Sequence, residues 1–353
     1  MMNKSQNHLL CRTIKSILLS VIVLLLAAPA AAAVHPKNLA AAGASDPPAV
    51  GLAIDAAATI TNGTVTLGVN PEGNLIVGPI GLTYVPTGGE ALAPGCDCEG
   101  WGLGDAVTGA FGKAGQSFGD ANITVESFTT TADSAVSVVL VNDGGDVYRV
   151  THDYHPSSSP NLYQVDVTVE NISAAAVTVR YRRAMDWDVP PTEFSELVTL
   201  ITNGATNVIF SSDDGFADGN PFAGPSSILF TGEATDSGPA DHGALFDFDF
   251  GSLAVGETDD FTIFYGASAN QDEALAALIA VGAEIYSLGK PNPADPTVGT
   301  DGSPNTFIFG FAGVGGSVIG ISEPIPVPGL ATWGLGIMVL MLGFFGIRRM
   351  RRS

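Results

Sequence analysis

The chain has 353 residues, with 36 acidic and 14 basic side chains and a formal net charge of -22. Apolar residues make up 46% of it, which is enough for a sizeable core and excludes a disordered acidic chain over most of the length. The acidity argues against a nucleic-acid partner and against a broad basic face for anionic lipid. The 43 glycines and 22 prolines favour an all-β fold rich in loops over a helical bundle.

Residues 1–33 have the three parts of a secretory signal peptide. A basic start precedes an apolar run at 17–26, which is too short to span a bilayer comfortably. Small residues up to Ala33 then suit cleavage, so we expect signal peptidase to be a partner; an uncleaved anchor is the alternative. Residues 34–57, rich in alanine with scattered proline, are expected to be a flexible leader.

The segment 58–313 is expected to be one exported β domain. Short runs of alternating apolar and polar residues, separated by Gly, Asn, Asp and Pro, are typical of a large antiparallel β-sandwich, with a supersandwich as one variant. The expected strands are 65–69, 123–131, 134–142, 146–154, 161–170, 177–189, 197–201, 206–211, 226–231, 244–250, 259–266 and 306–311.

One helix is expected on the C-terminal side of this domain. Asn270 can cap its start, with Glu273 three residues later as in a capping box. An apolar stripe continues to Leu288, and Gly289 follows as a stop signal. We expect this helix to pack across one end of the sandwich.

The runs 161–170 and 177–189 are expected to form one hairpin, with arginines on the second strand opposite acids on the first. The predicted pairs bring Arg180 and Arg182 opposite Asp166 and Glu170. Arg183 falls on the apolar face, so it is either buried with a partner or marks a bulge.

His152, Asp186 and Asp188 are candidates for catalysis or metal binding. An imidazole with carboxylates suits zinc, and Asp186 with Asp188 has the spacing of a glycosidase carboxylate pair. Strand alternation turns His152 and His155 to opposite faces, which favours a core histidine instead. The alternative for both aspartates is pairing with the nearby arginines.

An acidic turn is the candidate calcium site; apart from this calcium, no cofactor is expected. Its oxygen ligands would come from Asp213, Asp214, Asp218 and Asn220. The spacing is not that of an EF-hand, so a solvated loop is the alternative.

Cys96 and Cys98 remain once the signal peptide, with Cys11, is removed. We expect a local disulfide between them, with a link between chains or a metal or redox role as alternatives. The glycines on either side predict an exposed loop here.

Residues 329–347 contain no charged side chain and, at about 1.5 Å per residue, a helix of this length would cross a bilayer core. Arginines follow at once, and by the positive-inside rule the tail 348–353 stays cytoplasmic while the main body lies outside. A buried core helix is the alternative. The arginines are Arg348, Arg349, Arg351 and Arg352.

The segment just before this helix resembles the IPTL-CTERM sorting signal, a relative of the PEP-CTERM signals that exosortase-type enzymes process in Gram-negative bacteria. Gly329 and Ala331 depart from the usual Thr and Ser. The resemblance covers 324–353, including the end of a Gly/Pro linker at 314–328. It implies export across the inner membrane, transient anchoring, an exosortase-type processing partner, and a cell-surface or extracellular destination. The matching residues are Val327, Pro328, Leu330, Trp333 and Gly334.

The sequence therefore predicts an exported β-sandwich protein with a structural or binding role rather than an enzyme. The alternative is a carbohydrate-binding or carbohydrate-active protein that associates with exopolysaccharide, because signals of the PEP-CTERM type often accompany polysaccharide production. The body between the two targeting ends, 34–323, holds all 36 acids and only seven of the 14 bases, so it is more acidic than the whole chain.

Overall fold

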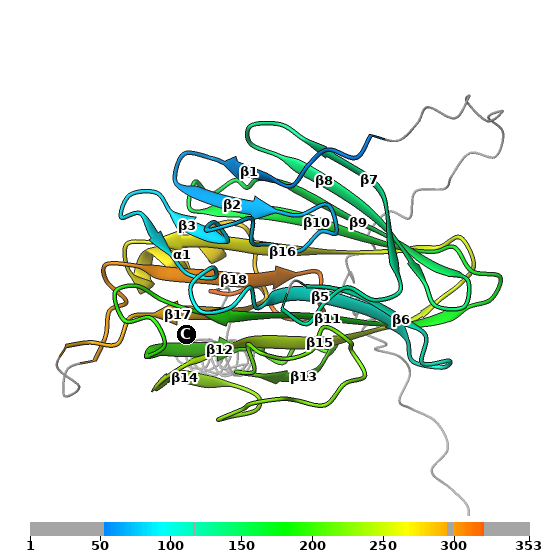
Figure 1. The fold of residues 1–353 in the computed structure, drawn as a ribbon. Coiled ribbons are helices and arrows are strands. Elements are labelled where there is room, and N and C mark those ends of the chain that lie inside the picture. Colours follow the sequence, from blue (N-terminus) through cyan, green and yellow to red (C-terminus); the bar gives the residue numbers. More distant parts are fainter. Residues whose placement is uncertain (1–52, 116, 295–298, 321–353) are drawn as a thin grey trace, which may run out of the picture. The chain divides into compact units, whose positions relative to one another are not determined.

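The computed structural model describes residues 53–115, 117–294 and 299–320, which form a β protein with antiparallel sheets (Figure 1). The chain divides into units 1–50 and 51–353, and the described residues all belong to the second. The expected all-β class is confirmed. The expected signal peptide, the sorting motif, the helix 329–347 and the basic tail lie outside the described residues. Within the described ranges, no helix is long and apolar enough to cross a membrane.

The largest sheet has nine strands in the order β14-β12-β17-β18-β16-β10-β9-β8-β7. Their bounds are β7 (Ile123–Thr130), β8 (Ala135–Asn142), β9 (Asp146–Pro156), β10 (Leu162–Asn171), β12 (Glu196–Ile201), β14 (Ala234–Ala240), β16 (Thr258–Ser268), β17 (Ile285–Lys290) and β18 (Thr306–Ala312).

Two smaller sheets complete the fold. The five-stranded sheet has the order β13-β15-β11-β5-β6, with β5 (Glu99–Asp105), β6 (Phe111–Gly115), β11 (Val177–Trp187), β13 (Val208–Ser212) and β15 (His242–Leu253). The four-stranded sheet runs β1 (Ala58–Thr61), β2 (Val65–Val69), β3 (Leu82–Tyr84) and β4 (Gly89–Glu90).

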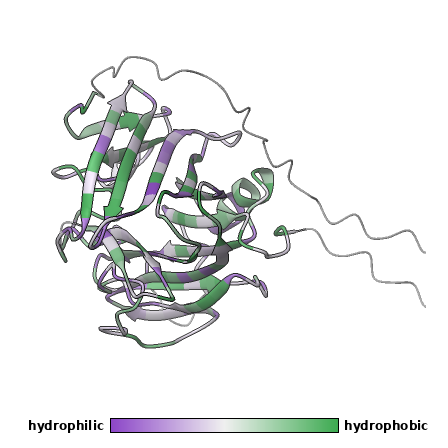
Figure 2. Cartoon of the chain, turned by 90° about the vertical axis from the view of Figure 1, so that its right-hand side faces the viewer, coloured by the Kyte–Doolittle hydropathy of each residue, from purple (hydrophilic) through white to green (hydrophobic). Residues whose placement is uncertain are grey.

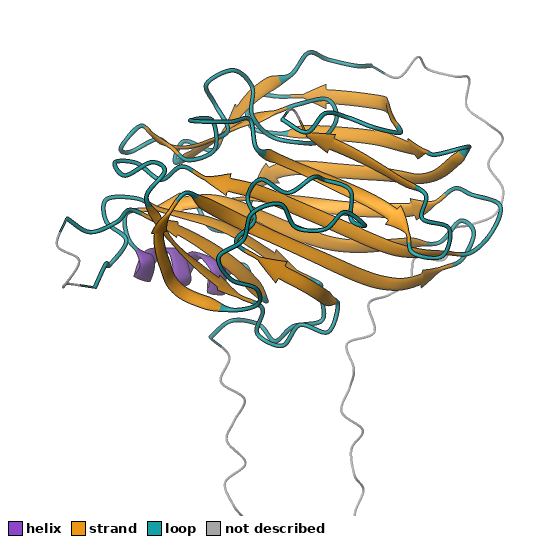
Figure 3. Cartoon of the chain, turned by 60° about the horizontal axis from the view of Figure 1, so that its bottom comes forward, coloured by secondary structure: helices purple, strands orange, loops and turns teal. Residues whose placement is uncertain are grey.

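The nine- and five-stranded sheets pack face to face as a β-sandwich, and Figure 3 shows the strands in layers. Bands of hydrophobic and hydrophilic residues alternate along the strands (Figure 2), as period-2 geometry requires when one face is buried. Between the sheets the indole of Trp187 donates to Ser287 at 3.1 Å, and the hydroxyl of Tyr148 donates to the Gly104 carbonyl at 3.2 Å. The core is therefore made by both sheets together.

A buried ion pair lies inside this core. The guanidinium of Arg183 donates to the carboxylate of Glu99 at 2.6 Å, and neither side chain is exposed. The hydroxyl of Tyr265, from the other sheet, donates to the same Glu99 oxygen, and Arg183 donates to Tyr154 Oη at 3.3 Å. Of the two sequence alternatives for Arg183, burial with a partner is the one found.

The expected hairpin between 161–170 and 177–189 is wrong. β10 pairs with β9 and β16 in the nine-stranded sheet, whereas β11 pairs with β15 and β5 in the opposite one. The chain crosses from one sheet to the other between these strands, because each has its apolar face turned toward the shared core. Arg180 and Arg182 therefore meet acids of β15 and not Asp166 or Glu170.

The expected helix is correct at its start and too long at its end. α1 spans Gln271–Ala280, and the side chain of Asn270 accepts a hydrogen bond from the Glu273 N–H. Gly282 then takes a positive φ of 71°, which ends the helix at low steric cost. The apolar residues from Ile285 onward belong to strand β17, where they pair with β12 and β18.

The sequence pattern missed several strands, among them the glycine-rich β5. The segment around Gly100, Gly102 and Gly104 was expected to be an exposed loop, but it forms the buried strand β5. A Cβ on Gly102 would lie 1.9 Å from the Gly219 carbonyl oxygen, so the glycines let another loop lie directly on the strand. β3, β4, β6, β14 and β17 were also missed, and 226–231 forms only an isolated bridge at Thr231.

We predict that Arg183→Leu lowers the free energy of unfolding by about 3–5 kcal/mol, because the Glu99 charge then stays buried without its partner. Replacing both residues by leucine should recover much of that loss. Arg180→Leu is the matched control: its pair with Asp249 is partly exposed and should contribute less than about 1 kcal/mol. Urea denaturation of the variants measures this, and similar losses for Arg183→Leu and Arg180→Leu would contradict it.

Candidate functional site

Charged side chains lie in opposed pairs on the outer face of the five-stranded sheet, where β11 runs antiparallel to β15. Arg180 lies opposite Asp249, and Arg182 lies opposite Asp247. Both pairs form ion pairs, at 3.0 and 2.6 Å. The sequence places β11 in this orientation because its odd-numbered residues from 177 to 187 are inward and mostly apolar, which leaves the even-numbered ones outward.

The same face changes character at the end of the two strands. Asp186 lies opposite Gly243, and the pairing ends at Trp187 and His242. Asp188 follows β11 on the side of Asp186, and Asp241 comes just before β15 begins. Beyond the two arginine–aspartate pairs, the ends of these strands therefore bring three aspartates together with no arginine of the described residues opposite them. The expectation that Asp186 and Asp188 pair with the arginines is wrong, since both arginines are engaged with β15.

Asp186, Asp188 and Asp241 form one cluster, and each offers a carboxylate oxygen that lies within 4.8 Å of the others. The first two side chains are buried, at 2% and 0% exposure, and Asp241 is exposed. Among the described residues, Asp186 Oδ1 and both oxygens of Asp188 are buried without a hydrogen-bond partner. Buried polar atoms in this state are rare in folded proteins and therefore call for an explanation.

Two loops cover the cluster. The chain at 91–98 runs beside β11, where the backbone N–H groups of Asp188 and Asp186 donate to the carbonyls of Ala91 and Cys98, both at 2.9 Å. On the other side, Gly215 lies so close that a Cβ there would be 2.7 Å from Asp186 Oδ1. The backbone of the loop thus closes over the carboxylate.

Burial and mutual repulsion dominate the electrostatics of this cluster. Burial, followed by the neighbouring Asp241 charge, raises the pKa of Asp186 to about 7. Burial and then the Asp186 charge raise the pKa of Asp188 to about 8. Glu196 of β12 approaches from the nine-stranded sheet, and burial is the main reason that its pKa is raised to about 8. Chemically, the group is suited to hold a positive ion or protons.

The structure does not bring His152 to these aspartates. His152 is fully buried between the sheets, with Nε2 3.2 Å from Tyr181 Oη and its ring centroid 4.9 Å from that of Trp101. Tyr181 points inward from β11, whereas Asp186 has the opposite parity on the same strand. His155 lies at the other face of β9, 3.2 Å from Asp166.

The residues of the predicted calcium turn each have protein partners. Asp213 accepts from the Leu229 and Phe230 N–H groups and lies 3.0 Å from His242 Nδ1, and Asp214 accepts from Ser226. Asp218 is ion-paired with Lys113 at 2.6 Å, and the Asn220 side-chain oxygen accepts from Phe222. These contacts tie the loop 213–230 together. Calcium binding at this turn stays a prediction.

Cys96 and Cys98 are joined by a disulfide in the structure. Cys98 is 8% exposed, and the Cys96 sulfur lies 3.7 Å from Asp186 Oδ2. The disulfide thus belongs to the loop that covers the acidic cluster.

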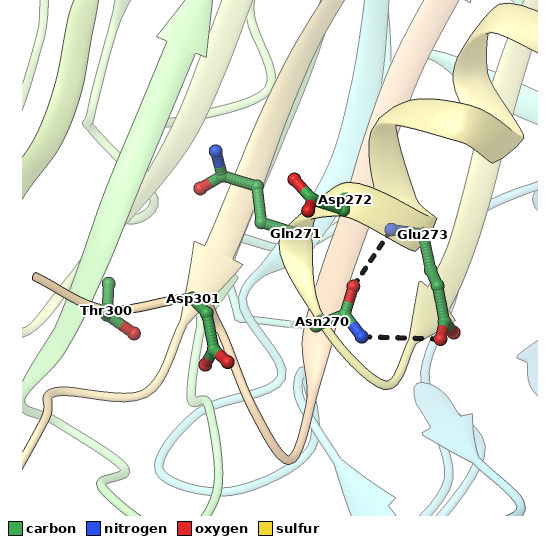
Figure 4. A pocket seen from close by; sticks show the side chains of 6 residues that line it. All are labelled: Asn270, Gln271, Asp272, Glu273, Thr300 and Asp301. Carbon is green, nitrogen blue, oxygen red and sulfur yellow. Dashed lines mark hydrogen bonds between the residues drawn. The ribbon is translucent and has the colours of Figure 1, made fainter.

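A separate hollow of about 470 Å³ opens at the start of α1 (Figure 4). Asn270 in its wall is engaged with Glu273 in the helix cap, as the dashed lines show. None of the predicted catalytic or metal-binding residues lines this hollow. Its lining side chains are Asn270, Gln271, Asp272, Glu273, Thr300 and Asp301.

Asp241 is the member of the acidic cluster that the sequence pattern missed. The strand was expected at 244–250, whereas β15 begins at His242. Had its start and its pairing with β11 been known, counting along the two strands would have set Asp241 beside Asp188.

No family model matches the chain, and no curated protein matches it. Among solved structures it is similar to a putative aldose 1-epimerase from Escherichia coli K12, with 13% identity, a TM-score of 0.29, and coverage of 74% of this chain and 92% of that chain. It is also similar to a galactose mutarotase related enzyme from Lactobacillus acidophilus, with 12% identity, a TM-score of 0.28, and coverage of 73% of this chain and 86% of that chain. At such TM-scores, the interpretation of this chain depends on its own residues and not on the likeness.

We predict that His152 makes the protein less stable below about pH 6.5. Burial lowers the pKa of His152 well below its ordinary value, and the Arg183 charge lowers it further, while Tyr181 Oη is its hydrogen-bonding neighbour. The unfolded chain then takes up a proton that the folded chain refuses, so stability falls as pH falls. Between pH 6 and pH 5, His152→Gln should lose about 1 kcal/mol less than the wild type in urea denaturation.

The matched control is His155→Gln. Burial alone would lower the pKa of His155, but the Pro156 carbonyl and Asp166 outweigh it, and the net shift is upward. Its contribution to stability therefore grows as pH falls through the folded pKa and is nearly complete below about pH 6.5, so the variant should gain less stability than the wild type between about pH 8 and pH 6.5 and run nearly parallel to it from pH 6 to pH 5. Parallel pH profiles for all three proteins would show that neither histidine acts in this way.

Proposed function

We propose that this chain is an exported cell-surface or extracellular β-sandwich protein with a structural or binding role, sorted by an exosortase-type signal at its C-terminus. After export across the inner membrane, the segment 329–347 anchors it transiently until the tail is processed. The single structural observation that supports this is the Cys96–Cys98 disulfide, since such bonds persist in oxidising compartments outside the cytoplasm.

The remaining support comes from the chain's charge distribution. Seven of the 14 basic residues lie in the two short targeting ends, as topology signals require. The body is strongly acidic, which favours solubility and repulsion between copies at a surface. The interior placement of His152, away from Asp186 and Asp188, gives an enzyme based on this group no support.

We predict that the mature protein recovered from a host with an exosortase-type system lacks residues 1–33 and is shortened near the sorting motif. Intact-mass spectrometry of the medium and envelope fractions measures both ends. A Trp333→Ala variant should accumulate in the membrane with its tail intact, because the motif has lost a matching residue, while Trp187→Phe serves as a matched aromatic control. Full-length wild-type chain that retains both ends in every fraction would contradict export and sorting.

A second proposal is carbohydrate binding, with exopolysaccharide as the partner. The observation that favours it is the hollow of Figure 4, whose lining side chains are all polar and offer donors and acceptors for sugar hydroxyls. Asp272, Glu273 and Asp301 are the exposed carboxylates on this wall, and of these Glu273 is engaged with Asn270 in the helix cap.

We predict that the chain is retained by exopolysaccharide beads prepared from its host and that Asp272→Ala with Asp301→Ala weakens retention at least about fivefold, as expected for loss of two hydrogen-bonded groups. Asp146→Ala, at an exposed aspartate that does not line the hollow, is the control. Absence of wild-type retention on any glycan would remove this second function and leave the first untouched.

A further inference from the structure

We propose that Asp186, Asp188 and Asp241 bind a calcium ion on the outer face of the five-stranded sheet. The site differs from the acidic turn that the sequence suggested, and it does not depend on export or on carbohydrate binding. Its ligands come from the adjoining ends of two hydrogen-bonded strands, β11 and β15, which lie side by side in Figure 1.

The acidic cluster has no positive charge opposite it in the part of the chain that the structure describes, unlike the rest of this face. Along the outer face of these strands, Arg180 and Arg182 each meet an aspartate of β15. At the end of the same row, Asp188 and Asp241 bring acid against acid, and Asp186 meets only Gly243. A cation here would continue the alternation that the arginines begin.

No basic side chain of the described residues is left to neutralise the cluster. Each lysine and arginine in the described ranges already has an acidic partner elsewhere, and none of these partners is Asp186, Asp188 or Asp241. The pairs are Lys113–Asp218, Arg149–Glu126 and Glu170, Arg180–Asp249, Arg182–Asp247, Arg183–Glu99 and Lys290–Asp236.

Independently of the charge pattern, three carboxylate oxygens of the cluster are buried without a hydrogen-bond partner within the described ranges. Asp188 is fully buried, and neither of its carboxylate oxygens has a hydrogen-bond partner; Asp186 Oδ1 is in the same state. A buried carboxylate in water-free surroundings needs several hydrogen bonds or a counterion. One carboxylate oxygen from each of Asp186, Asp188 and Asp241 lies within 4.8 Å of the other two, so a single ion can contact all three residues.

The donor set and its spacing indicate the class of ion. All three ligands are carboxylate oxygens, which hard cations prefer, and no histidine or cysteine thiolate takes part, as zinc would favour. Calcium–oxygen distances of about 2.3–2.6 Å allow two ligands of one ion to lie up to roughly 5 Å apart, and the three oxygens lie within 4.8 Å of one another. Exposed Asp241 leaves an open side for entry and for water ligands.

The test is calorimetric titration of calcium into the full chain, purified in mild detergent and stripped with EDTA. One ion per chain should bind with a Kd at or below about 1 mM, and magnesium more weakly. Asp241→Asn changes an exposed ligand and should weaken calcium binding at least about tenfold, and Asp188→Asn should do so to a similar or greater extent. Asp146→Asn, at an exposed aspartate outside the cluster, is the matched control and should bind as the wild type does, while Asp218→Asn reports separately on the acidic turn.

Thermal unfolding with and without calcium provides a second measurement if one of the variants folds poorly. Calcium should raise the unfolding temperature of the wild type and of Asp146→Asn, and it should leave that of Asp241→Asn nearly unchanged. Two results would overturn the site: no calcium binding by the wild type at about ten times the expected Kd, or a folded Asp241→Asn and Asp188→Asn that both bind like the wild type. Binding lost only in Asp218→Asn would assign the ion to the acidic turn instead.

Discussion

The ion pair between Arg183 and Glu99 constrains all three sheets at once. Both residues come from the five-stranded sheet, yet the pair is completed by Tyr154 and Tyr265 from the nine-stranded sheet. Glu99 also accepts from the Leu75 N–H, and Arg183 donates to the Gly73 carbonyl, both in the loop after β2. Two buried charges contribute little net stability, but any packing that separates them leaves a charge unpaired in the core. The pair therefore penalises other registers of these sheets.

The orientation of the outer carboxylates follows from this inward constraint. Strand geometry alternates side chains, so holding Arg183 inside fixes its even-numbered neighbours on the outside. Arg182 is thereby directed to Asp247, and Asp186 with Asp188 to the face covered by the loops 91–98 and 213–219. A one-residue slip of β11 would exchange the two faces, which would turn the acids into the core between the sheets and the inward apolar and aromatic residues away from it. The register of β11 therefore determines both the core network around Arg183 and the position of the acidic cluster.

The residue pattern predicted where several strands lie, and burial of Arg183 was one of its two alternatives. It did not predict which strands are neighbours in a sheet. Alternation located β7 to β11 and β16 because each has one apolar face, and it failed at β5, whose glycines carry no hydropathy signal although their bare backbone admits the loop at Gly219. It also joined β10 to β11 as a hairpin, because adjacency along the chain does not reveal which sheet a strand joins. Asp186 and Asp188 were identifiable as residues, whereas their isolation from the arginines and their meeting with Asp241 required the β11–β15 register.

The loop that carries the disulfide gives the acidic cluster a connection to the proposed location of the protein. The disulfide joins Cys96 to Cys98 within the segment 91–98, whose Ala91 and Cys98 carbonyls accept from Asp188 and from β11, so the bond fixes the local shape of the cover over Asp186 and Asp188. An oxidising exterior keeps such a bond closed, and the same exterior commonly holds calcium at concentrations suited to weak oxygen-ligand sites. Inside the cytoplasm both conditions fail together: thiols are kept reduced, and free calcium is far too low to fill a site of this kind. The burial of Asp186 and Asp188 close to the Asp241 charge is thus costly before export and, once calcium binds outside, becomes compensated. That order of events would favour completion of the fold outside the cell.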